Sequence, residues 1–142
     1  MTARRTQLRS WAIALAALTG LTIGMARPVH PAEFVVNSID DHMDGTCDGA
    51  DCSLRDAVWV ANLDPGADLI SLPAGNFVLD IPGPDEDDCL TGDIDILSAM
   101  IIVGMGADAT IIDAGSLGDR VLHVNASGES VGLANLTVTG GV

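Results

Sequence analysis

From Asp68 onward, the chain contains apolar segments of three to five residues, most of them followed by a glycine, asparagine, aspartate or proline. Several segments are apolar at consecutive positions, and no helical period appears after Asn62. Strands of a β-sandwich are usually longer and alternate cleanly. Three short strands per turn, with small or polar corner residues, are what a parallel β-helix needs. The expected strands are 33–39, 69–72, 77–79, 94–96, 100–103, 110–112, 121–124 and 136–139.

One amphipathic helix is expected before these strands. The apolar positions that share one helical face are Leu54, Ala57, Val58 and Ala61. Ser53 is placed to cap the N-terminus, with Asp56 three residues on in a near capping box, and Pro65 prevents continuation. A helix of about ten residues is unstable alone. We therefore expect it to cover the open end of the sheet stack.

The three cysteines predict a disulfide next to this helix. Cys47 and Cys52 have four residues between them, and Gly49 allows the chain to turn. In an oxidising compartment we expect a Cys47–Cys52 bond that staples the cap and stabilises it by roughly 2 kcal/mol. Cys89 is left over, either free or in place of one of the other two. No His or Cys pair has the spacing of a zinc site.

The first 26 residues have the three parts of a secretory signal peptide. Three arginines fall in the first ten residues, residues 11–25 are apolar, and small residues surround Met25. The apolar run is shorter than the roughly 20 residues that span a bilayer. We expect export, a linker at 27–32, and no transmembrane span in the mature chain.

The chain is strongly acidic, with a net charge of −14 and no acidic residue before Glu33. Removal of residues 1–26 takes away three arginines, which moves the charge from −14 to −17. Such a surface repels nucleic acid and anionic lipid. Two interpretations stay open. The like charges keep the molecules soluble and apart from one another, or the surface binds cations.

The acidic loop of residues 40–51 is the candidate metal site, with Ca²⁺ as the candidate ion. The predicted ligands are Asp40, Asp44, Asp48 and Asp51. Three of them, with Gly45, match positions of a Ca²⁺-binding loop, but position 3 is His42 and position 12 is Asp rather than Glu. The alternative is that these residues form solvated turns. No other cofactor is expected.

Two further side chains have structural explanations. Arg55 is expected to form an ion pair or to contact backbone carbonyls, and Arg120 to pair with its neighbour Asp119. Alternation along a strand places His123 on the opposite face from its two neighbours, so we expect it to be exposed.

Residues 52–58, Cys-Ser-Leu-Arg-Asp-Ala-Val, resemble the CSLREA motif, with Asp56 in place of Glu. This motif opens the N-terminal region of many bacterial secreted right-handed parallel β-helix proteins, related in fold to pectate lyases. Further matches follow in the family's order at 66–70, 72–77, 86–87, 91–96, 102–106, 110–113, 119–121 and 136–141.

This resemblance implies an all-β, right-handed parallel β-helix with a cap at 33–67 and the first coils at 68–142. The structural cap motif would comprise Ser53, Leu54, Arg55, Asp56, Ala57 and Val58. Family members usually continue through more coils, so the chain is expected to be a truncated part of such a protein. In lyases of this fold, an arginine near Asp-bound Ca²⁺ removes a proton. Arg120 is a candidate for that role, although no strand here carries a facing carboxylate cluster.

Three functions remain open. The preferred one is an exported or cell-surface β-helix module, in bacteria, with a structural or adhesin-like role and no catalysis. Its partners would be an extracellular polysaccharide or protein. A polysaccharide lyase or hydrolase is the alternative that fold analogy suggests. A Ca²⁺-dependent binding module is the third. Because only about three coils fit in the chain, we also expect self-association through the uncovered C-terminal end.

Overall fold

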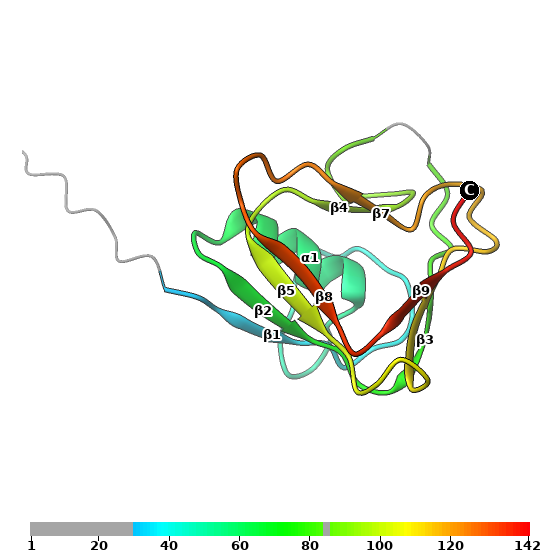
Figure 1. Cartoon of the computed structure of the whole chain (residues 1–142), viewed down its shortest axis with the longest axis horizontal. Helices are drawn as coiled ribbons and strands as arrows, with labels where there is room; N and C mark the ends of the chain where they lie inside the picture. The colour runs from blue at the N-terminus through cyan, green and yellow to red at the C-terminus, as the bar shows by residue number, and fades with distance from the viewer. Residues whose placement is uncertain (1–29, 84–85) are drawn as a thin grey trace, which may run out of the picture.

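The computed structural model describes residues 30–83 and 86–142 and shows a short β-solenoid with one helix (Figure 1). The expected signal peptide lies outside the described residues. The elements are β1 (Glu33–Val35), α1 (Leu54–Leu63), β2 (Asp68–Ser71), β3 (Gly75–Val78), β4 (Ile94–Ile96), β5 (Met100–Val103), β6 (Thr110–Asp113), β7 (Leu122–Val124), β8 (Val131–Ala134) and β9 (Thr137–Thr139).

The strands form three sheets around an aliphatic interior. Their orders are β1-β2-β5-β8, β3-β6-β9 and β4-β7, and every strand pairing in the described part of the chain is parallel. The coils β2-β3-β4, β5-β6-β7 and β8-β9 follow one another, so the predicted parallel β-helix is confirmed. α1 lies at the N-terminal end of the stack, where it contacts β1, β2 and β4.

The interior is a column of equivalent positions from successive coils. Ile70 pairs with Ile102, and Ile102 pairs with Leu133. Ile70 and Ile102 are fully buried, whereas Leu133 in the last coil is 44% exposed. Burial of aliphatic side chains is the main stabilising term for such a stack. The middle coil therefore contributes most, because it is covered on both sides.

Substitutions of two adjacent isoleucines of β5 test whether this stacked interior stabilises the fold. Replacing buried Ile102 with alanine is expected to lower the free energy of unfolding by about 2–4 kcal/mol, because it leaves a cavity between two coils. The matched control is Ile101→Ala: Ile101 is 49% exposed, and we expect a loss below about 1 kcal/mol. Urea unfolding followed by circular dichroism measures both. Equal losses would contradict the stacked interior.

The helix prediction is confirmed, and the strand predictions are confirmed with small changes of boundary. Leu54, Ala57, Val58 and Ala61 are buried. The first strand ends at Val35 rather than at residue 39, because the backbone amides of Asn37 and Ser38 donate to Cys52 O instead of to β2. Strand β8 was not expected, since Gly132 and Ala134 have low β propensity. It forms because it stacks on β5.

Candidate functional site

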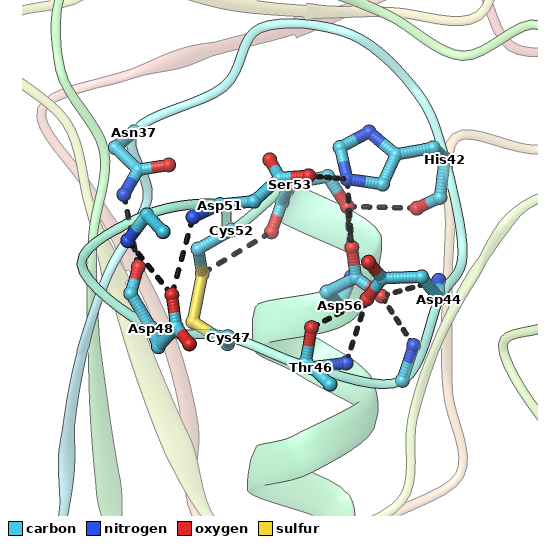
Figure 2. The surroundings of a disulfide bond; sticks show 12 residues. Asn37, His42, Asp44, Thr46, Cys47, Asp48, Asp51, Cys52, Ser53 and Asp56 are labelled. Carbon is cyan, nitrogen blue, oxygen red and sulfur yellow. Dashed lines mark hydrogen bonds and ion pairs between the residues drawn. A yellow bond between two sulfur atoms is a disulfide. The ribbon is translucent and has the colours of Figure 1, made fainter.

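The disulfide loop that precedes α1 forms as expected, with Cys47 bonded to Cys52 (Figure 2). Within it, the Asp48 carboxylate accepts backbone N–H groups of Ala50 at 2.7 Å and Asp51 at 3.2 Å. A backbone hydrogen bond from Asp48 N to Asp51 O closes the turn at 3.0 Å. Asp48 is therefore a turn-forming residue, as the alternative to a Ca²⁺ site predicts.

The start of α1 is tied to this loop through Asp56, which is fully buried. Ser53 Oγ accepts the Asp56 backbone N–H at 3.0 Å, so the predicted N-cap is confirmed. The reciprocal half of the capping box is different. The Asp56 carboxylate accepts the backbone N–H groups of Asp44 and Gly45, both at 2.9 Å, and lies 2.8 Å from Ser53 Oγ. Asp56 thus holds the acidic loop against the helix.

His42, Asp44 and Asp51 form a group that could hold a metal ion, with one ligand atom of each lying within 4.8 Å of the others. His42 Nε2 lies 3.3 Å from Asp51 Oδ2 and 3.2 Å from Asp56 Oδ2. That nitrogen atom is buried and has no hydrogen-bond partner among the described residues. Hydrogen bonds from the Thr46 side chain and backbone hold the pKa of Asp44 below its usual value.

The structure therefore brings together only part of the predicted Ca²⁺ site. Asp44 and Asp51 lie together, whereas Asp40 and Asp48 are outside the group. His42 was a mismatch in the loop pattern, but it contributes the third donor. An imidazole nitrogen beside two carboxylates suits a transition metal better than Ca²⁺, which prefers oxygen ligands.

Arg55 lies at the centre of a buried polar network. Its side chain is fully buried and forms two hydrogen bonds to Asp41, from Nε at 2.8 Å and from Nη2 at 3.0 Å. The guanidinium also donates to the backbone carbonyls of Cys89, Gly92 and Asp93, at 3.4, 2.8 and 3.2 Å. Both predicted kinds of contact, the ion pair and the carbonyl contacts, are present.

Asp41 completes this network and joins three parts of the chain. Its Oδ2 atom also accepts the backbone N–H groups of Asp80 and Ile81, at 2.9 and 3.1 Å. Burial acts to raise the pKa of Asp41, but the hydrogen bond and charge of Arg55, together with the backbone N–H groups of Asp80 and Ile81, outweigh it, so the pKa lies below its usual value. The sequence did not single out Asp41 as the partner of Arg55. A buried arginine needs a carboxylate, but the acidic loop offered several.

A second polar group joins β4 to β7 and corrects the expectation for His123. His123 Nδ1 lies 2.9 Å from Asp95 Oδ1 and 3.3 Å from Asp87 Oδ1. The side chain of His123 is only 28% exposed, because strand register places it beside the fully buried Asp95. Burial raises the pKa of Asp95. These three residues are the second group with metal-ligand geometry among residues 30–83 and 86–142.

Arg120 has a different main partner from the one expected. Its Nε lies 2.9 Å from Asp93 Oδ2, whereas the neighbouring Asp119 Oδ1 is 3.9 Å away. The expected pair with Asp119 is therefore present but is the weaker of the two, because Asp93 of the preceding coil lies closer to Arg120 in the stack. The hydrogen bond with Asp93 raises the pKa of Arg120, which keeps it protonated and makes it a poor proton acceptor.

Cys89 is a free thiol, so it does not displace either partner of the disulfide. It is fully buried, and burial raises the pKa of this thiol to about 12. Its backbone N–H donates to Asp95 Oδ2 at 3.0 Å. Because the thiolate is the reactive form, Cys89 is an inert core residue rather than a nucleophile.

Together these features define a short parallel β-solenoid whose first coil is closed by an α-helix and a disulfide-bonded acidic loop. Comparisons with family models, with curated proteins and with solved structures find no match to this chain. Within residues 30–83 and 86–142, α1 is too short to cross a membrane, and no other helix is a candidate for a membrane span.

Proposed function

We propose that the chain is an exported β-solenoid module with a structural or adhesin-like role, and that it is not an enzyme. The observation that supports this most directly is that the buried charged side chains form hydrogen bonds within the fold. Arg55, Asp56 and Asp95 are fully buried, and each forms hydrogen bonds to other parts of the fold. Groups committed in this way hold loops and coils together and are not free to act on a substrate.

The polysaccharide lyase alternative depends on Arg120, and the geometry disfavours it. Its guanidinium is paired with Asp93 and stays protonated. The acidic surface also repels polyuronate substrates. A screen on pectin, alginate and heparin-like polymers tests this alternative. Turnover of any of them would overturn the non-enzymatic role. In that proposed role, an extracellular polysaccharide or protein is a binding partner and not a substrate.

Export is supported by the bonded cysteine pair, since disulfides persist in oxidising compartments. We propose that residues 1–26 direct this export and that the chain is related to the CSLREA-motif proteins. The test is a fusion of the full chain to a bacterial alkaline phosphatase, which is active only outside the cytoplasm. We expect activity from the full chain and at least a tenfold loss when residues 1–26 are deleted. Equal activity without them would contradict the proposal.

For the 142-residue polypeptide we also propose self-association through its last coil. Leu133 and Val138 of that coil are 44% and 39% exposed, and Val124 of β7, the last strand of its sheet, is 54% exposed. The outer edges of β8 and β9 have no paired strand among the described residues. Open strand edges and uncovered apolar coils favour pairing with a second copy. Light scattering in the micromolar range is expected to show species larger than the 14.6 kDa monomer. A uniform monomer would contradict this.

A further inference from the structure

We infer that the open edge of β1 and the disulfide loop form a groove for an extended peptide that carries lysine or arginine. β1 is the outermost strand of the four-stranded sheet. It bonds to β2 through the Ala32 carbonyl at 2.9 Å and the Val36 N–H at 3.0 Å. Backbone groups of alternate residues point to the same neighbouring strand in a parallel sheet. Glu33 and Val35 therefore direct their N–H and C=O groups away from β2.

The outward backbone groups of β1 are open at Glu33 and Val35, but those of Asn37, which follows the strand, are covered by the disulfide loop. Asn37, two residues after Val35, donates its backbone N–H to Cys52 O at 3.0 Å. Its side-chain amide donates to Asp48 O at 2.9 Å. No such partner is found for the outward groups of Glu33 and Val35 in the part of the chain that the structure describes. The edge thus offers two donors and two acceptors next to a loop that blocks its continuation.

A cavity of about 470 Å³ lies along this open edge. One wall is β1, the other is the loop Cys47–Gly49, and Asn37 closes one end. A peptide strand added to an exposed sheet edge takes its affinity from main-chain hydrogen bonds and its specificity from alternate side chains. The outward backbone groups of β1 supply the first element, and the lining residues Glu33, Val35 and Asp48 are the candidates for the second.

The charge of the groove selects the kind of peptide. Glu33 of β1 and Asp48 of the loop both line the groove and are exposed, and the chain as a whole carries a net charge of −14. The Glu33 carboxylate accepts a hydrogen bond from Ser71 Oγ of β2 at 3.2 Å, so its charge lies beside the open edge. Val35, 58% exposed, provides an apolar contact in the same groove. A strand that alternates basic and small apolar residues complements both features. A nucleic acid or an anionic polysaccharide would be repelled.

The disulfide fixes the second wall of the groove. The Cys47–Cys52 bond closes the loop, and the Asn37 side chain donates to the backbone carbonyl of Asp48 within it. Binding is therefore expected to depend on oxidation, although neither sulfur atom needs to touch the peptide. This inference does not rest on the structural role or the export proposed above, because it uses only the geometry of β1 and the loop.

The probe is a fluorescent peptide of about six residues that alternates lysine and valine, titrated into the full oxidised chain and followed by anisotropy. Val35→Pro removes one outward N–H and leaves the β1–β2 ladder intact. We expect it to weaken binding about tenfold. Glu33→Gln with Asp48→Asn is expected to weaken binding by about three- to tenfold, whereas Glu129→Gln, an exposed acid elsewhere, has no effect.

Hydrogen exchange on the unmodified chain provides a measurement that needs no variant. The peptide is expected to slow exchange at the Glu33 and Val35 amides and to leave the Val36 amide, already bonded, unchanged. The inference is overturned if Val35→Pro keeps its near-ultraviolet circular dichroism and full affinity, or if a glutamate–valine peptide binds equally well. It is also overturned if the edge is occupied by a second copy, seen as a dimer that Val35→Pro dissociates and the peptide does not.

Discussion

Replacing Arg55 with methionine is expected to lower the free energy of unfolding by about 3–5 kcal/mol, the largest effect of a single substitution in this chain. Methionine fills a similar volume but leaves the buried Asp41 carboxylate without its cation. The substitution also removes the N–H groups that donate hydrogen bonds to the backbone carbonyls of Cys89, Gly92 and Asp93. Urea unfolding monitored by tryptophan fluorescence measures the loss.

The control for this substitution is Arg120→Met. Arg120 also pairs with a nearly buried aspartate, but its own side chain is 46% exposed, so water replaces the lost interaction. We expect a loss below about 1 kcal/mol. The double variant Arg55→Met/Asp41→Asn is expected to recover part of the loss, because it removes the uncompensated charge. Equal losses for Arg55→Met and Arg120→Met would show that the Arg55 network does not hold the cap.

The same ion pair predicts how stability depends on pH. The pKa of Asp41 is lower in the folded chain than its ordinary value of 3.8. The ionised, paired state therefore contributes stability above about pH 4, and this contribution is lost as the pH falls through the folded-state pKa. The Arg55→Met/Asp41→Asn variant lacks this contribution. Its unfolding free energy is expected to change less between pH 5 and pH 2 than that of the unmodified chain.

The sequence predicted local features well, since these depend on neighbours along the chain. Ser53 and Pro65 delimit α1, and the spacing of Cys47 and Cys52 predicted their bond. Runs of β-branched residues predicted most strands. Strand β8 was missed because its stability comes from stacking on β5 rather than from its own residues.

Contacts between coils could not be predicted, because the coils have unequal lengths. Asp68 pairs with Met100, Gly75 with Thr110, and Ile111 with Thr137, which are offsets of 32, 35 and 26 residues. With no constant repeat, a residue's partner in the next coil cannot be counted along the sequence. The contacts of Arg120 with Asp93 and of His123 with Asp95 were missed for this reason.

The disulfide has the second large expected effect. Replacing Cys47 and Cys52 together with alanine is expected to lower the free energy of unfolding by about 2 kcal/mol from loop entropy, with a further loss because Cys52 is fully buried. Cys52 O also accepts the backbone amides of Asn37 and Ser38, so the bond fixes the point where the chain leaves β1. Thermal unfolding with and without dithiothreitol measures the effect.

Sensitivity to the reductant separates the cross-link from the packing of the side chains. Dithiothreitol is expected to destabilise the unmodified chain and a Cys89→Ala variant by similar amounts, because Cys89 is a free thiol outside the bond. The Cys47→Ala/Cys52→Ala variant should be insensitive to it. If reduction left the unmodified chain unchanged, the bond would not be what holds the acidic loop against α1. That loop would then depend on the hydrogen bonds of Asp56 with Asp44 and Gly45 and on the ion pair of Arg55 with Asp41.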